Sequence, residues 1–251
     1  MSDRQGRLIA LHSGHPAENM AIDQALLESV GVSDRPVLRL YTWSEPTLSI
    51  GYFQSIADRR VHDESKGLVC VRRSTGGGAI VHHHELTYSI AVPMDASLAG
   101  PRLDLYQRTH LAFVQSLSEF GVRAVPFRST DRKQPSAAKN RFLCFQRRTD
   151  EDLIVSGYKV LGSAQRKTRH AVLQHGSLLL RASRWAPQLP GVCDLGSRSI
   201  PIGQFSERWT AALADLLSIE WSKDEISQAE GLRVTEITTQ RFSSRDWLYR
   251  R

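Results

Sequence analysis

The chain has 251 residues, of which 41% are hydrophobic and 24% are charged, and its formal net charge is +7. This is the composition of a globular protein with a substantial core in one large or two small domains, and its apolar runs are far shorter than the roughly 20 residues that span a bilayer. No signal-peptide core follows the N-terminus, and the 3 widely spaced cysteines argue against a disulfide framework. We therefore expect a cytoplasmic protein.

The positive charge indicates an acidic partner, which can be a nucleic acid, a phosphate-bearing cofactor or an acidic protein. Nucleic-acid binding would call for a basic helix or for aromatic residues interleaved with basic ones on a strand. The basic residues are instead scattered, and the densest group, residues 128–148, lies in a loop-like region typical of a solvated face. We expect no nucleic-acid partner.

Apolar periodicity predicts an α+β fold, with a mixed β-sheet and packed helices in a single domain over residues 1–251. The clearest helix runs from Leu103 to Phe120, where apolar residues recur every three or four positions. Further helices are predicted at 16–31, at 55–66 and, in a helical C-terminal portion of about 205–251, at 205–218, 222–231 and 239–249, with an extended piece near 233–236. Strands are predicted at 8–11, 36–43, 47–52, 68–71, 87–92, 122–127, 152–155, 159–161 and 171–180, and long loops at 128–141 and 185–203.

One stretch stands between two strand-like runs, with the sequence Arg-Arg-Ser-Thr-Gly-Gly-Gly-Ala-Ile at 72–80. Consecutive glycines suit a place where a ligand approaches the backbone closely or where φ is positive, and a flexible hairpin loop is the alternative. The adjacent arginines and the histidines at 82–84 favour a site for an anionic or carbonyl-bearing ligand. Neighbouring histidines on a strand point to opposite faces, so we predict no metal site.

Three further blocks follow this stretch: Glu-Leu-Thr-Tyr-Ser at 85–89, Lys-x-x-Gly-Ser-Ala-Gln at 159–165 and Leu-Gln-His-Gly-Ser at 173–177. With Arg-Arg-x-x-Gly-Gly-Gly-Ala-x-x-His at 72–82, they occur in an order that resembles the lipoate–protein ligase and octanoyltransferase superfamily. That superfamily shares its fold with the catalytic domain of biotin–protein ligases. The resemblance extends from near the N-terminus to about residue 180 and is weaker beyond it.

The resemblance implies transfer of an octanoyl or lipoyl group to a lysine of a lipoyl domain. Ligases of the superfamily activate free lipoate with ATP and use no cysteine, whereas its transferases take octanoyl from a thioester through a cysteine acyl-enzyme. Cys144, followed by Phe145 and upstream of Lys159, occupies the place of that cysteine. A thiolate is needed for attack, and nearby cations favour it. A small buried hydrophobe is the alternative interpretation of Cys144; Cys70 and Cys193 are assigned to the core and to an incidental loop position.

By the same resemblance Cys144 and Lys159 are catalytic, and the glycine block with its flanks borders the acyl group. The substrate-binding residues implied are Arg72, Arg73, Gly76, Gly77, Gly78, Ala79, His82, Gly162, Ser163, Ala164 and Gln165. Gln174 and His175 are interpreted as structural. Two positions depart from the family pattern: His83 replaces a usual Asp, and the run Gln-Arg-Arg-Thr at 146–149 replaces an acidic or small residue and a Pro-Ser pair.

The favoured hypothesis is a monomeric octanoyl or lipoyl transferase that requires no cofactor. Its donor would be acyl carrier protein or an octanoylated or lipoylated protein, and its acceptor a lipoyl domain. One alternative is an ATP-dependent lipoate–protein ligase that uses ATP and Mg; the short stretch after the last motif argues against the extra C-terminal domain of many ligases. The second alternative is a non-catalytic relative that binds an acyl group or a protein.

Overall fold

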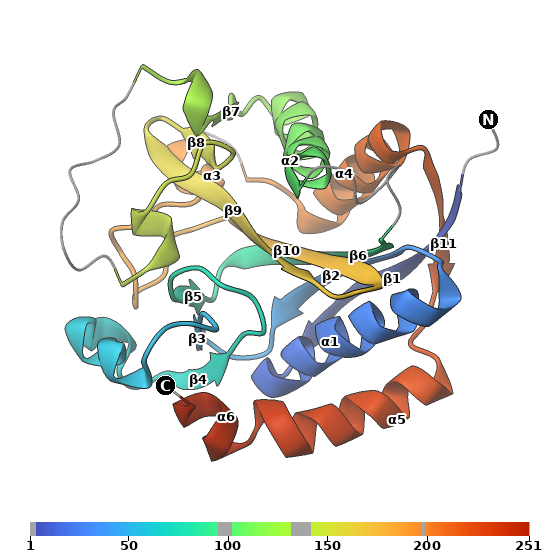
Figure 1. Ribbon diagram of the computed structural model, residues 1–251. Helices are drawn as coiled ribbons and strands as arrows, with labels where there is room; N and C mark the ends of the chain where they lie inside the picture. The colour runs from blue at the N-terminus through green and yellow to red at the C-terminus, as the bar shows by residue number, and fades with distance from the viewer. Residues whose placement is uncertain (1–3, 95–101, 132–141, 197–198, 251) are drawn as a thin grey trace.

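A computed structural model describes residues 4–94, 102–131, 142–196 and 199–250 (Figure 1). Within these residues the main sheet has the strand order β11-β1-β2-β6-β10-β9-β8-β7, and a small sheet has the order β4-β3-β5. The strands are β1 (Arg4–Gly14), β2 (Val37–Trp43), β3 (Thr47–Ile50), β4 (Val69–Arg72), β5 (Ile80–His82), β6 (Glu85–Pro93), β7 (Val125–Pro126), β8 (Leu153–Val155), β9 (Tyr158–Lys167), β10 (Ala171–Leu179) and β11 (Ile219–Asp224). The predicted α+β fold class is confirmed.

Helices cover both faces of the main sheet (Figure 1). The helices are α1 (Pro16–Ser33), α2 (Arg102–Glu119), α3 (Val192–Leu195), α4 (Ile202–Leu217), α5 (Gln228–Ile237) and α6 (Arg245–Tyr249). Helices α2 and α4 pack on one face, and α1 and α5 on the other, each pair closing its own apolar core. In α4, Phe205, Trp209, Leu213 and Leu217 recur every four residues and are all buried, as an amphipathic helix requires. None of the helices in the described part of the chain is both long and apolar enough to cross a bilayer.

The centre of the main sheet carries two of the sequence motifs. Strand β10 pairs antiparallel with β6 on one side and with β9 on the other. Its register sets Gly176 opposite Ser163 and Gln174 opposite Gln165, so motifs that are separate in the sequence become neighbours. Every residue of β6 and β10 is buried. A tight turn at Ser156 and Gly157, with φ of 47° and 87°, joins β8 to β9 into a hairpin, as the strands predicted at 152–155 and 159–161 on either side of a Ser-Gly pair indicate.

The stretch between β4 and β5 is not a hairpin loop. Strand β3 lies between the two, parallel to β4 and antiparallel to β5, so residues 73–79 (the glycine segment) cross over the end of β3. The short strand β5 was not predicted. Gly77 has a φ of 96°, and a Cβ on Gly51 would stand 2.1 Å from the Gly77 carbonyl oxygen. The glycines are therefore needed for backbone conformation and for close approach of two segments.

The C-terminal portion corrects three predictions. Residues 219–224 form strand β11 where part of a helix was expected, because they alternate in burial and pair in parallel with β1. Residues 233–236 belong to α5 and are not extended, because Ser227 and Glu230 form a capping box that starts this helix. The expected loop at 185–203 contains α3. The part of the loop predicted at 128–141 that spans 132–141 lies outside the described residues.

Candidate active site

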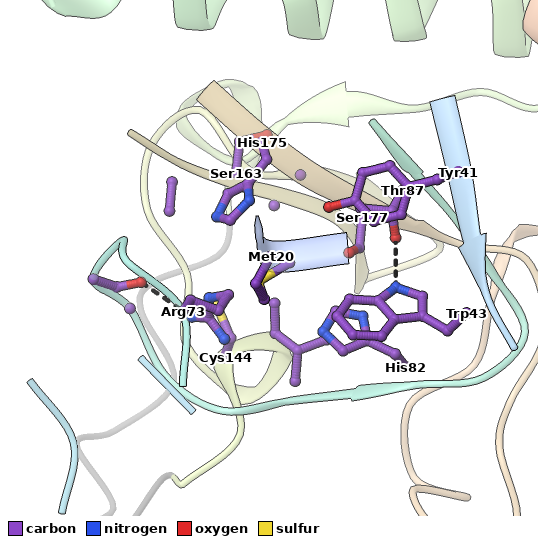
Figure 2. Close-up of a pocket in the computed structure, with 16 residues that line it drawn as sticks. Met20, Tyr41, Trp43, Arg73, His82, Thr87, Cys144, Ser163, His175 and Ser177 are labelled. Atoms are coloured by element: carbon purple, nitrogen blue, oxygen red, sulfur yellow. Dashed lines mark hydrogen bonds between the residues drawn. The ribbon is translucent and has the colours of Figure 1, made fainter. Parts of the chain in front are cut away.

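A narrow cavity with an empty volume of about 420 Å³ lies between the small sheet and strands β9 and β10. Figure 2 shows the Cys144 sulfur at one side of it and the rings of Trp43 and His82 at another. Its lining includes eight of the predicted site residues: Arg73, Gly76, Gly77, His82, Cys144, Gly162, Ser163 and Ala164. Most of its exposed lining is apolar, so it suits an acyl chain.

Cys144 lines this cavity, and Lys159, which lies outside the lining, contacts the Cys144 sulfur. Cys144 begins a single 3₁₀ turn, Cys144–Gln146, and Lys159 enters from the start of β9. The Lys159 Nζ atom lies 3.7 Å from Cys144 Sγ and 2.8 Å from Asp152 Oδ2, and Lys159 is only 5% exposed. Burial opposes the lysine charge, but the thiolate form of Cys144 and the Asp152 carboxylate outweigh it and raise the pKa of Lys159. A buried ammonium therefore faces the sulfur.

Asp152 is the partner that holds this ammonium in place. It is 1% exposed, and its Oδ2 atom also accepts a hydrogen bond of 2.7 Å from the Thr149 backbone N–H. Asp152 was predicted to begin a strand and was assigned no role in the site. The β8–β9 hairpin was the available signal, because its antiparallel pairing brings the residues before β8 close to those that follow its turn.

Two glycines make room for the pair. A Cβ on Gly162 would lie 2.5 Å from Lys159 Cε and 2.7 Å from its Nζ, so only glycine leaves the lysine head in this position. A Cβ on Gly78 would lie 2.9 Å from the Cys144 backbone nitrogen. Ala79 fixes the same backbone, because its carbonyl oxygen accepts a 2.7 Å hydrogen bond from the Cys144 N–H. Gly78 and Ala79 thus act behind the cysteine rather than on the cavity wall.

Arg73 supports the glycine segment from inside. Its guanidinium donates to the Ser49 carbonyl and hydroxyl oxygens at 3.0 and 2.7 Å, and to the Gly76 and Gly78 carbonyl oxygens at 3.0 Å each. Burial lowers the pKa of Arg73, and the thiolate form of Cys144 acts in the opposite direction. Arg73 therefore shapes the loop and adds a second positive charge near the sulfur.

Arg72 points elsewhere. It is fully buried, and its guanidinium donates to the carbonyl oxygens of Gly51, Tyr52, Gln54, Trp247 and Leu248 at 2.6–3.1 Å. These contacts attach the last helix, α6, to strand β4, which lie side by side in Figure 1. Arg72 does not line the cavity, and its geometry is that of a structural residue. Its predicted contact with substrate stays a prediction.

His82 forms the polar end of the cavity. Its ring stacks on Trp43 with 3.9 Å between centroids, its Nδ1 atom lies 2.5 Å from Glu85 Oε1, and its Nε2 atom lies 2.7 Å from the Ser49 hydroxyl. Burial lowers the pKa of His82, and the Glu85 charge acts against that shift. The Trp43 indole N–H donates to Thr87 at 3.0 Å, the bond drawn in Figure 2. The indole is therefore fixed as a flat apolar wall.

Ser163 and Ala164 separate this cavity from a surface groove that Tyr106 and Gln165 also line. The Ser163 hydroxyl lies 2.6 Å from the Tyr88 hydroxyl and 2.7 Å from His110 Nε2, and the Tyr106 hydroxyl bonds to the Ser163 backbone. Burial lowers the pKa of His110 to about 4, so the imidazole is neutral at pH 7. Gln165 lies outside the acyl cavity and donates to Gln174 at 2.7 Å.

His175 joins the cavity to a buried network that sequence reasoning missed. Its Nε2 atom lies 2.7 Å from the Thr75 hydroxyl, and its Nδ1 atom lies 3.1 Å from Asp23. Asp23 also accepts from Arg39 at 2.8 Å and from Tyr41 at 2.9 Å. Burial alone would raise the pKa of Asp23, but His175 and Arg39 lower it. The spacing of residues in the sequence did not indicate a site role for Asp23, which lies on the buried side of α1.

The other two cysteines lie away from the cavity lining. Cys70 packs against the small sheet's core, where burial raises the pKa of its thiol to about 11. Cys193, on α3, packs against the main core. The position of Cys70 agrees with its core assignment, whereas Cys193 lies on a helix against the core and not in the expected loop. Both cysteines are natural controls for Cys144.

The family model described as the lipoyl protein ligase A/B catalytic domain matches residues 15–213. The octanoyltransferase LipM of Carboxydothermus hydrogenoformans is 30% identical, over 93% of this chain and 94% of its own. The LipM of Staphylococcus aureus is also 30% identical, over 95% and 96%.

Solved structures share the fold. A bi-partite lipoate protein ligase from Thermoplasma acidophilum, described with its E2 lipoyl domain, superposes with a TM-score of 0.77 at 21% identity, over 98% of this chain and 96% of its own. A lipoate-protein ligase A bound with ATP gives a TM-score of 0.76 at 22% identity, over 98% of each chain.

Proposed function

The chain belongs to the lipoyl protein ligase A/B catalytic-domain family, and on that premise we propose that it is an octanoyltransferase of protein lipoylation that works through a Cys144 acyl-enzyme. Octanoyl transfer is the activity of its LipM relatives, which match nearly the whole chain. The cysteine route is supported by one observation: the Lys159 ammonium lies 3.7 Å from the Cys144 sulfur beside an apolar cavity.

In the first half of the reaction the Cys144 thiolate attacks the carbonyl carbon of an octanoyl thioester. A new carbon–sulfur bond to Cys144 forms, and the bond to the donor's sulfur breaks. Lys159 supplies the proton that converts the leaving thiolate into a thiol. One thioester replaces another, so the donor already holds the activation energy that ATP would otherwise provide, and no cofactor is needed.

In the second half an acceptor lysine amine attacks the octanoyl-Cys144 carbonyl. A carbon–nitrogen bond forms, the carbon–sulfur bond to Cys144 breaks, and Lys159 takes up the proton that the amine loses. The thiolate and the ammonium are thereby restored. The step is favourable because an amide replaces a thioester. The acceptor is a lipoyl-domain protein, and we propose an acyl carrier protein as donor and a cytoplasmic monomer as the active form.

The test is incubation of the protein with octanoyl-carrier protein in the absence of ATP, followed by intact-mass measurement. We expect the wild type to gain one octanoyl group, and the Cys144→Ala variant to gain none. Cys70→Ala and Cys193→Ala serve as matched controls and should be acylated as the wild type is. Transfer from acylated enzyme to a lipoyl domain should then occur without nucleotide.

Two results would contradict the proposal. Modification of a lipoyl domain that requires ATP and Mg and persists in Cys144→Ala would identify a lipoate–protein ligase. Binding of an octanoylated protein with no covalent product under either condition would identify a non-catalytic relative.

A further inference from the structure

Three arginine side chains gather around two aromatic rings beside the glycine segment. Arg166 comes from β9, Arg241 from the π-helical turn Thr238–Phe242, and Arg250 from the residue after α6. The Arg250 guanidinium carbon lies 4.2 Å from the centroid of Tyr52 and 4.6 Å from that of Trp247. Arg166 lies 5.8 Å from Tyr52, and Arg241 lies 3.9 Å from Trp247. Cation–π contacts therefore hold the guanidiniums together.

Among the residues that the structure describes, none of these three arginines forms a salt bridge with a carboxylate. Burial lowers the pKa of Arg241, and the charges of Arg166 and Arg250 lower it further. Glu28 acts in the opposite direction, but its carboxylate already pairs with Arg233 at 2.8 Å. A bound anion would relieve this mutual repulsion.

The cluster contacts the glycine segment, which also borders the acyl cavity. Arg166 donates to the Ser74 carbonyl oxygen at 2.9 Å, and the Tyr52 N–H donates to the Thr75 carbonyl oxygen at 2.8 Å. The next residues along the chain, Gly76 and Gly77, line the acyl cavity together with Cys144. An anionic group held by the arginines would thus be at the rim of the cavity.

We propose that Arg166, Arg241 and Arg250 bind the phosphate group on the arm that carries the thioester donor. This inference rests on the proposed function, since it assigns a place to one part of the same substrate. A carrier arm has a phosphate at one end and the acyl thioester at the other, so a single donor presents both groups to this face. Guanidinium groups bind phosphate through paired, charge-assisted hydrogen bonds. A compact phosphate also matches a small cluster better than a broad acidic protein surface does.

The test compares two small donors, S-octanoyl-pantetheine and S-octanoyl-4′-phosphopantetheine. The acylation of Cys144 by each donor is monitored by intact-mass measurement of the protein. We expect the wild type to favour the phosphorylated donor by at least about tenfold in kcat/KM, as one charged hydrogen bond implies. In Arg241→Gln and Arg250→Gln this preference should fall to within about threefold. Arg208→Gln, which changes an exposed arginine on α4, should keep the wild-type preference. Tm values establish that each variant is folded.

The possible outcomes separate the hypotheses. A wild type without preference for the phosphorylated donor, or variants that retain it, would overturn the phosphate assignment. Variants that are impaired only with intact octanoyl-carrier protein would also overturn it, since the cluster would then meet an acidic protein surface. If no donor acylates the wild type, the proposed function itself fails, and this inference fails with it.

Discussion

Substitution of Gly162 by alanine should weaken catalysis without unfolding the protein. The new Cβ would lie 2.5 Å from Lys159 Cε, whereas ordinary contacts begin at 3.4 Å. The lysine head must therefore move away from residue 162 by about 1 Å. Because the clashing atoms are the far end of a flexible side chain, the backbone need not move, and we expect a Tm within a few degrees of the wild type.

The expected loss follows from the distance between Lys159 Nζ and Cys144 Sγ. At 3.7 Å and an effective dielectric constant of about 20, the ammonium and a thiolate attract each other by about 4.5 kcal/mol. An increase of about 1 Å removes about 1 kcal/mol of this attraction, which corresponds to about a fivefold weaker stabilisation of the thiolate. Acylation of Cys144 should slow by at least the same factor.

The assay measures two rates at pH 7: alkylation of Cys144 by iodoacetamide, followed by peptide mass, and acylation by octanoyl-carrier protein. Gly67→Ala is the matched control, because a Cβ at Gly67 meets no atom within 4 Å. Both rates should fall in Gly162→Ala and stay unchanged in the control. If Gly162→Ala reacted at the wild-type rate with an unchanged Tm, the position of the Lys159 ammonium would not matter, and the reasoning would be wrong.

Three further substitutions test the surroundings of the site. Gly78→Ala places a Cβ 2.9 Å from the Cys144 backbone nitrogen, which cannot yield, so both acylation and stability should fall, with a Tm loss of about 5–10 °C in a thermal melt. His110 is deprotonated in the folded protein down to a pKa of about 4 but has a pKa of about 6.5 when unfolded. The free energy of unfolding should therefore fall as the pH drops from 6.5 towards 4. In urea denaturation, the wild type should lose about 2 kcal/mol more of this free energy between pH 7 and 5 than His110→Gln does. An equal loss in the two proteins would refute this. Arg72→Gln should lower the free energy of unfolding by about 3 kcal/mol and expose the segment around Leu248 to protease. A raised KM at unchanged stability would instead support the predicted substrate contact of Arg72.

The sequence was most informative where function depends on short local blocks. The motif that begins at Lys159 and the one that ends at Ser177 lie on strands β9 and β10, which were both predicted as strands, although their antiparallel pairing was not. Their meeting with Cys144 was expected from the family resemblance, and the geometry brings them together. The roles of these residues in catalysis and binding stay predictions until the experiments are done.

Tertiary contacts set the limits of that prediction. Arg72 and Arg73 are adjacent and identical, yet the first donates to the carbonyl oxygens of α6 and the second to the glycine segment. Successive residues near a strand end face opposite sides, so the two arginines reach different partners. The α6 partners of Arg72 are far along the chain, and the local sequence therefore does not distinguish the two roles. The same applies to strand β11, because its pairing with β1 forms a strand from residues 219–224, of which 222–224 were expected to be helical.

Arg72 and strand β1 both pair with residues near the C-terminus, which are synthesised late. One edge of strand β1 pairs with residues 219–224, so that edge stays unpaired until those residues have been made. The Arg72 guanidinium likewise cannot complete its hydrogen bonds until residues 247–248 have been made. During synthesis the glycine segment emerges long before either partner. Every residue that lines the acyl cavity lies between positions 20 and 177, so the strand and the helix that pair with β1 and Arg72 are synthesised only after the whole cavity lining.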